Sequence, residues 1–163
     1  MELLQKYKSP NFTERRGGHN APSMIIVHYT GMKTGREALE RLCDPKSEVS
    51  SHYVIEENGD VYQLVDDDKR AWHAGACEWA GEADVNSASI GIELVHPGHE
   101  WGYREFMEPQ IDALIDLCKG LISQYDISLE RILGHEDVAP GRKQDPGELF
   151  PWKRLRDALF VSG

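Results

Sequence analysis

Long apolar runs are missing from this 163-residue sequence. No stretch approaches the roughly 20 consecutive apolar residues that a membrane-spanning helix needs. The N-terminal segment MELLQKYK also lacks the apolar core and the small-residue cleavage site of a signal peptide. We therefore expect a protein that does not bind a membrane and that works in the cytoplasm.

Cysteine is scarce and scattered. Cys43, Cys77 and Cys118 show no CxxC spacing, and their number is odd. A disulfide framework is therefore not expected, which fits a reducing compartment. Cys118 lies on the apolar face of a predicted helix, where a cysteine usually acts as a small core residue. We interpret all three cysteines as structural.

Basic residues are outnumbered by acidic ones. The chain has 18 Lys and Arg against 28 Asp and Glu, which gives a formal net charge of −10. Nucleic acids and anionic membranes are bound through basic patches. The charge therefore argues against both partners, and it mildly favours a small soluble ligand over an anionic polymer.

The length and the apolar content suffice for one core. A chain of 163 residues, 40% of them hydrophobic, can bury one sizeable core but hardly two. We see neither an internal repeat nor a linker. We predict a monomer with a single domain over residues 1–163, in which the core covers about 20–160 and residues 1–19 pack against it or are partly extended.

The patterning predicts a mixed sheet with helices. The β-branched run between Pro22 and Gly31 is typical of a buried central strand. An Asn58-Gly59 pair between two apolar runs is the strongest short signal for a hairpin. Apolar residues at helical spacing from Ile111 to Ile122 indicate the clearest helix. Strands are expected at 23–30, 52–56, 61–65 and 89–95, helices at 34–42, 109–125 and 151–160, and long loops at 71–87 and 134–150.

Two histidines and an aspartate form a candidate metal site. His28 ends the central strand, His135 opens a loop, and Asp145 precedes a Pro-Gly turn in the same loop. Two nitrogens and one carboxylate oxygen would leave one tetrahedral position open, which is the pattern of catalytic zinc. Spacing alone leaves other ligands open, namely His52, His73, Glu136 and Asp137.

Six runs of the sequence resemble the motifs of one family and occur in the family's order. They are IIVHYT, SHYVI, WHAG, NSASIGIEL, GHEDVAPGRKQDPG and LFPW. Together they resemble the type 2 N-acetylmuramoyl-L-alanine amidases, which include phage amidases and the animal peptidoglycan recognition proteins. The resemblance implies a single α/β domain with a mixed, mainly β central sheet flanked by helices.

The resemblance also implies a set of catalytic residues. His28, His135 and Asp145 would hold one zinc ion, which lowers the pKa of bound water towards about 7 and polarises a carbonyl group. Glu93 would exchange protons with the attacking water and the leaving nitrogen. Lys143 would stabilise the negative oxygen of the tetrahedral intermediate. The expected reaction is hydrolysis of the amide between N-acetylmuramic acid, or its 1,6-anhydro form, and L-alanine.

The same resemblance assigns binding residues for a muropeptide, a soluble fragment of peptidoglycan. Trp72 and His73 would line the substrate groove, and Asn86 would hold the muropeptide. Many members that favour diaminopimelate-containing stems carry an arginine where this chain has Asp84, so no stem preference is predicted. His52 is expected to be structural. The remaining histidines, His19, His96 and His99, are expected at the surface.

Two rival functions remain open from the sequence. The acidic composition and the absence of an export signal favour soluble muropeptides, as in peptidoglycan recycling, over a lytic amidase that acts on intact cell wall. A non-catalytic peptidoglycan-binding module is the alternative from another class. The presence of all three candidate ligands with Glu93 and Lys143 argues against it.

Overall fold

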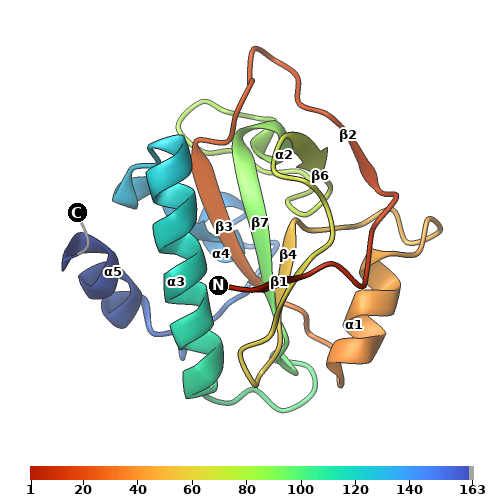
Figure 1. Cartoon of the computed structure of the whole chain (residues 1–163), viewed down its shortest axis with the longest axis vertical. Helices are drawn as coiled ribbons and strands as arrows, with labels where there is room; N and C mark the ends of the chain where they lie inside the picture. Colours follow the sequence, from red (N-terminus) through yellow and green to blue (C-terminus); the bar gives the residue numbers. More distant parts are fainter. Residues whose placement is uncertain (162–163) are drawn as a thin grey trace.

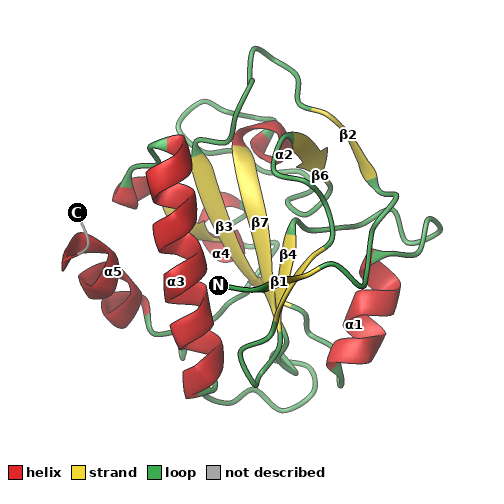
Figure 2. Cartoon of the chain, in the orientation of Figure 1, coloured by secondary structure: helices red, strands yellow, loops and turns green. Residues whose placement is uncertain are grey.

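A six-stranded sheet runs through the middle of the molecule in this computed structural model, which describes residues 1–161 (Figures 1 and 2). The strand order is β1-β5-β4-β7-β3-β8. All neighbours are parallel except β4 and β5, which form the hairpin. The sheet is therefore mixed, as predicted. The strands are β1 (Leu3–Leu4), β3 (Met24–Tyr29), β4 (Tyr53–Ile55), β5 (Val61–Gln63), β7 (Ser89–Leu94) and β8 (Ile132–Gly134).

Helices cover the sheet on both sides (Figure 2). The long helix α3 (Glu108–Tyr125) and the last described helix, α5 (Trp152–Val161), pack together on one face, and α1 (Gly35–Leu42) lies on the other side of the sheet. None of the helices in residues 1–161 is long and apolar enough to cross a membrane. The final residues of the expected domain, 162–163, lie outside the described part of the chain.

The two central strands divide their side chains between two environments. Ile25 and Val27 of β3 belong to the apolar cluster under α3. Met24 and Ile26 point to the opposite face, where they pack in a second cluster. Because side chains alternate along a strand, His28 continues the Met24–Ile26 face. The side chain of His28 therefore points away from the long helix.

Strand β7 pairs in parallel with β3, so its side chains alternate between the same two faces of the sheet. In the register of β3 and β7, His28 lies opposite Glu93 and Ile26 lies opposite Gly91. Residues opposite each other in a sheet project to the same face, so His28 and Glu93 are neighbours on the face that α3 leaves uncovered. The fold thus joins two of the expected site residues through backbone pairing.

The N-terminal residues are partly extended and pair with the domain. β1 adds to the edge of the sheet beside β5, and β2 (Phe12–Glu14) pairs with β6 (Lys69–Ala71) in a separate two-stranded sheet. Between them, buried Asn11 donates to the backbone carbonyls of Asp44 and Val49. These long-range contacts attach the segment to the rest of the chain.

Two short helices lie inside the regions expected to be loops. At the end of 71–87, the structure has α2 (Val85–Ala88), which extends one residue further, and within 134–150 it has α4 (His135–Val138). Another short helix, η1 (Leu129–Arg131), precedes β8. One helical turn is too short to show apolar periodicity, so the sequence pattern could not reveal these elements.

Asp84 caps the first turn of α2. Its carboxylate accepts hydrogen bonds from the amide and the hydroxyl of Ser87, and it forms ion pairs with Arg70 and Arg16. Although burial opposes ionisation, the hydrogen bonds from Arg70, Ser87 and Arg16 lower the pKa of Asp84 to about 2. The residue in the position of the family's arginine therefore holds the turn that delivers Asn86.

We expect Asp84→Ala to lower the free energy of unfolding by about 1–2 kcal/mol at neutral pH, because it removes a helix cap. The folded-state pKa of Asp84 lies below its usual value, so its ionic contribution is present above about pH 4 and is lost as the pH falls towards the folded pKa. Urea denaturation across this pH range should show that the difference in free energy of unfolding between Asp84→Ala and wild type becomes smaller as the pH falls.

Asp66→Ala is the matched control, because Asp66 is exposed and its side chain does not cap a helix. It should change stability by less than about 0.5 kcal/mol. Equal losses for the two variants would contradict the assignment of Asp84 as the cap.

Candidate metal centre

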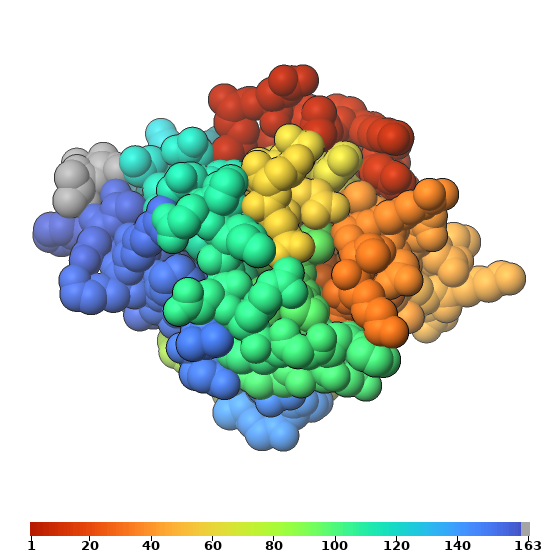
Figure 3. Space-filling model, turned by 90° about the horizontal axis from the view of Figure 1, so that it is seen from below, coloured from red at the N-terminus to blue at the C-terminus, as the bar shows by residue number. Residues whose placement is uncertain are grey.

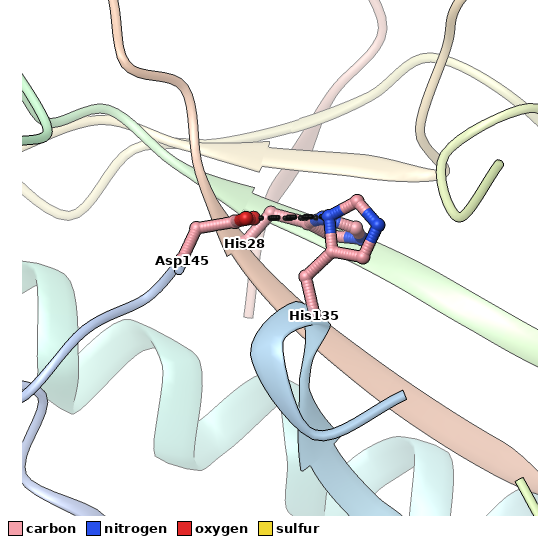
Figure 4. Close-up of side chains that lie close together, drawn as sticks. All are labelled: His28, His135 and Asp145. Carbon is pink, nitrogen blue, oxygen red and sulfur yellow. Dashed lines mark hydrogen bonds and ion pairs between the residues drawn. The ribbon is translucent and has the colours of Figure 1, made fainter. Parts of the chain in front are cut away.

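Three side chains from different elements converge on one point (Figure 4). His28 projects from the end of β3, His135 opens α4, and Asp145 comes from the loop before α5. Nδ1 of His28 lies 3.0 Å from Nδ1 of His135 and 3.1 Å from Oδ2 of Asp145. The remaining pair, His135 Nδ1 and Asp145 Oδ2, is 3.2 Å apart. All three residues are buried.

The spacing of these three atoms suits a small tetrahedral cation. Ligand atoms about 2 Å from zinc in a tetrahedron lie a little over 3 Å apart, close to the observed separations. Nε2 of His135 is 2.8 Å from the carbonyl oxygen of Ala74, which can only accept a hydrogen bond. The proton of neutral His135 is therefore on Nε2, and its Nδ1 lone pair points at the cluster.

The protonation states also suit metal binding. Burial, reinforced by repulsion from His135, lowers the pKa of His28 to about 4. Burial opposes ionisation of Asp145, but its close contacts with His135 and His28 hold its pKa well below the usual range. Neutral imidazoles and an ionised carboxylate are the forms that metal ions bind. The three residues therefore fit a divalent ion such as zinc.

The loop that carries Asp145 is held by an aromatic residue. The peptide bond between Asp145 and Pro146 is cis, and Gly147 has a φ of 90°. The Tyr103 hydroxyl donates to the carbonyl of Pro146 and accepts from the amide of Leu149. A side chain at Gly147 would collide with this hydroxyl. Glycine at this position thus permits both the left-handed turn and the contact with Tyr103.

Glu93 lies beside the cluster without belonging to it. Its Oε1 is 4.0 Å from Nδ1 of His28, and its side chain is 13% exposed. Oε2 is buried and has no hydrogen-bond partner among the described residues. Burial raises the pKa of Glu93 well above its usual value, the charge of Asp145 raises it further, and Lys143 opposes this effect. The carboxyl group is therefore able to bind and release a proton.

A cavity of about 520 Å³ opens over these groups. We call it the metal cavity; His28, Glu93, His135, Lys143 and Asp145 line it, together with Trp72 and His73. The segment after β7, green in Figure 3, lies against the chain that follows β3. Glu100 of this segment and Gly31 of the chain after β3 line one wall of the cavity. In this wall, the amide of Gly31 donates to the carbonyl of His96.

A second cavity of about 410 Å³ adjoins the first. Trp72, His73, His135 and Lys143 line both cavities. Asn86 and the cations Arg70 and Arg142 line the second one only. Glu48 also lines this cavity and Arg70 is paired with Asp84, so Arg142 and Lys143 supply most of its positive charge.

The family model described as N-acetylmuramoyl-L-alanine amidase matches residues 18–148 of this chain. The chain belongs to the N-acetylmuramoyl-L-alanine amidase family. This membership confirms the resemblance found in the six sequence motifs.

Two relatives are similar in sequence. The chain is 40% identical over 144 residues to the N-acetylmuramoyl-L-alanine amidase AmiD of Escherichia coli (strain K12), which covers 81% of this chain and 51% of AmiD. It therefore spans about half the length of that relative. It is 31% identical over 173 residues to the 1,6-anhydro-N-acetylmuramyl-L-alanine amidase AmpD of Haemophilus influenzae, which covers 95% of this chain and 91% of AmpD.

Solved structures of AmpD and AmiD share the fold. An AmpD structure superposes with a TM-score of 0.85 at 30% identity, covering 98% of this chain and 96% of that one. The Escherichia coli AmiD structure, solved with anhydro-N-acetylmuramic acid-L-Ala-D-γ-Glu-L-Lys, superposes with a TM-score of 0.79 at 35% identity. The latter match covers 90% of this chain and 60% of AmiD. The α/β fold of the family is thus present here.

Within this amidase fold, the structure separates the histidines that sequence spacing left open. His52 lies outside the cluster: its Nδ1 accepts from the amide of Gly91, and its Nε2 donates to the carbonyl of Lys69. His73 contacts His28, with 2.9 Å between Nδ1 of His73 and Nε2 of His28, but it does not reach the other two candidate ligands through a hydrogen bond.

The prediction that His96 lies at the surface is wrong. The ring is 1% exposed, stacks on Phe106, and is hydrogen-bonded to the carbonyl of Arg104. His96 belongs to the segment after β7, and its backbone carbonyl accepts from the amide of Gly31. His99 is half-buried and stacks on Tyr103. The sequence carries no local signal for the packing of the segment after β7 or for the contact of Tyr103 with the Asp145 loop. Both depend on residues that are distant in the sequence.

The cysteines lie apart from the cluster. Cys118 is buried in the core under α3, and burial raises the pKa of its thiol to about 12. Cys43 and Cys77 are half-buried, and burial raises their pKa values as well. A thiol with a raised pKa is a poor metal ligand and a poor nucleophile.

We expect the wild-type amidase to bind one zinc ion per chain and Asp145→Ala to weaken binding by more than about 100-fold, since loss of a ligand should exceed the loss from an outer contact. Competition with a coloured chelator, with metal content measured after dialysis, tests this prediction. Glu136→Gln is the matched control, because Glu136 adjoins His135 in sequence but lies outside the cluster. Equal zinc loss in both variants would refute this ligand set.

Proposed function

We propose that this protein hydrolyses the amide bond between N-acetylmuramic acid, in its ordinary or 1,6-anhydro form, and L-alanine in muropeptides. The observation that carries the proposal is the buried, unpaired carboxylate oxygen of Glu93 beside three converging ligand atoms in one cavity. A metal site alone would suit a binding module. A free acceptor next to it suits a hydrolase.

His28, His135 and Asp145 would hold the zinc ion through Nδ1, Nδ1 and Oδ2. Zinc would supply a Lewis acid for the amide carbonyl and lower the pKa of the attacking water. Within residues 1–161, the hydrogen-bond contacts of these three atoms are with one another. Their burial keeps bulk water from competing for the ion.

Glu93 would act as the proton carrier. Its unpaired Oε2 can take a proton from the attacking water, and the raised pKa of the carboxyl group favours holding that proton until the nitrogen of L-alanine accepts it. Amines are poor leaving groups unless they are protonated. The same carboxyl group would therefore serve both halves of the reaction.

Lys143 would stabilise the charge that develops on the carbonyl oxygen. It lines the metal cavity, and its positive charge acts on both Glu93 and His28. A cation near the developing negative oxygen stabilises it electrostatically. Its exposed position leaves the ammonium group free to meet the substrate.

The second cavity would hold the peptide stem. Trp72 and His73 connect the two cavities, and Asn86 lies in the second, in keeping with the binding roles that the resemblance implies. Arg70 and Arg142 would attract the carboxylates of a stem peptide. The names of the AmpD relatives and the ligand in the AmiD structure support an anhydro-muropeptide as one accepted form.

A soluble muropeptide suits the acidic chain better than an intact wall, and we propose a role in muropeptide recycling, with the enzyme acting as a monomer. Neither nucleic acid nor membrane is proposed as a partner. The cytoplasmic location expected from the sequence stays a prediction. Lytic action on intact wall is the alternative that the assay below separates.

The decisive assay incubates the zinc-loaded protein with defined muropeptides, with and without the anhydro ring, and with whole sacculi. We expect mass spectrometry to show free stem peptide and the intact sugar, because the lactyl to L-alanine bond is cleaved. Cleavage at any other bond would refute the proposed function. Release of peptide from sacculi alone would refute the recycling role.

Glu93→Gln should lower kcat by about 10²–10⁴-fold, the usual contribution of a general acid–base group. Zinc binding should remain, because Glu93 is not one of the converging ligands. Glu105→Gln, an exposed change on the segment after β7, should leave kcat unchanged. A Glu93→Gln protein with near wild-type kcat would remove Glu93 from the mechanism.

A further inference from the structure

The dipeptide His73–Ala74 contacts both candidate metal-binding histidines on the side away from the metal. Nδ1 of His73 is 2.9 Å from Nε2 of His28, and the carbonyl oxygen of Ala74 is 2.8 Å from Nε2 of His135. Each ring therefore has one nitrogen in the cluster and the other against this dipeptide. The contacts decide which nitrogen of each ring carries the proton.

A chain of three hydrogen bonds sets the proton on His28. The Ser89 hydroxyl has a single proton and is 2.6 Å from the carbonyl of Val85, which can only accept. Its 3.0 Å contact with Nε2 of His73 must then be a hydrogen bond that His73 donates. Neutral His73 carries no second proton, so its Nδ1 accepts from Nε2 of His28.

Burial keeps this direction in place. The ring of His73 is buried, and its two nitrogens face His28 and Ser89, neither of which offers a negative charge that would stabilise a cationic ring. His73 is therefore neutral. With its proton on Nε2, His28 directs its Nδ1 lone pair at the cluster, as His135 does through Ala74.

The dipeptide is itself held by a buried side chain. Oδ1 of Asn86 accepts from the amides of both His73 and Ala74, at 3.1 and 2.8 Å. The ring of His73 lies over Gly91, where a side chain would collide with it. Asn86 and Gly91 thus set the backbone and the ring, and Ser89 sets the proton.

We propose that His73 and Ala74, held by Asn86 and Ser89, are positioning residues that lock His28 and His135 in the Nε2-protonated tautomer and so present both Nδ1 atoms to the metal. This inference rests on the proposed zinc centre but not on the proposed substrate. It gives His73 a role beyond the substrate contact predicted from its motif. Both ring nitrogens of His73 have protein partners in this arrangement.

The first test reads the tautomers directly. Long-range ¹H–¹⁵N NMR spectra of the wild-type protein, zinc-loaded and metal-free, should show a proton on Nε2 of His28, His73 and His135. A proton on Nδ1 of His28 or His73 in the metal-free protein would overturn the inference. This measurement needs no variant, so it does not depend on a substitution being tolerated.

The second test weakens the relay at its far end. Ser89→Ala should weaken zinc binding by about 10–100-fold, the usual effect of losing an outer hydrogen bond to a metal ligand, and should give a mixture of His73 tautomers. Ser9→Ala is the matched control, because Ser9 is also buried and donates to a carbonyl at 2.6 Å, in its case that of Leu42. Ser9→Ala should keep the wild-type zinc affinity.

The third test asks whether the acceptor on His73 matters. His73→Asn keeps an acceptor near the place of Nδ1 and should retain more zinc affinity than His73→Leu, which fills similar space without one. If His73 had only a structural role, both variants would have lower melting temperatures, but His73→Asn would not bind zinc more tightly than His73→Leu. Equal zinc affinity for wild type, Ser89→Ala and His73→Leu would overturn the inference.

The outcomes separate the two proposals. A wild-type protein that binds no zinc would refute the metal centre and this inference with it. Zinc binding that depends on Ser89 in a protein without amidase activity would refute the proposed function and support the inference.

Discussion

The parallel pairing of β3 with β7 is the constraint on which the rest of the site depends. It sets His28 opposite Glu93, so the first candidate ligand and the candidate acid–base group are adjacent before any side-chain packing is considered. The same alternation puts Ser89 and Gly91 on that face of β7. A slip of one residue in register would move each of these groups to the apolar face under α3.

The free energy gained on the apolar face of the sheet offsets the cost of burying polar side chains on the opposite face. Ile25 and Val27 of β3 and Ile90 and Ile92 of β7 are fully buried against the long helix, and burying each such side chain is favourable by about 1.5–3 kcal/mol. Each buried imidazole on the opposite face instead needs its own hydrogen-bond partners, because burying a polar group without them is costly. The loops and the short helices α2 and α4 provide those partners, which explains why they lie on this side of the sheet.

The sequence predicted what local patterns can encode. The β-branched run around His28, the Asn58-Gly59 hairpin and the periodicity of α3 all appear where they were expected. Three features were not predictable, because each depends on contacts with distant residues. They are the single turns of α2 and α4, the pairing of β1 with β5 and of β2 with β6, and the burial of His96. Spacing alone likewise left several possible metal ligands. The structure brings His28, His135 and Asp145 together because three separate elements meet at the C-terminal end of the internal strand β3.

Hydrogen bonding distinguishes the histidines that frame the candidate site from Glu93, the candidate acid–base group. His28, His73 and His135 each have a partner at the nitrogen that faces away from the cluster or at both nitrogens. Only two buried side-chain atoms in the described residues lack a partner, Oε2 of Glu93 and Oε1 of Gln110, and Gln110 belongs to α3 on the other face. A buried acceptor without a partner costs about 1–3 kcal/mol. On the face with the candidate metal ligands, that cost falls on the carboxyl group beside them, so a rigid frame and a single free acceptor together mark where the proposed chemistry would occur.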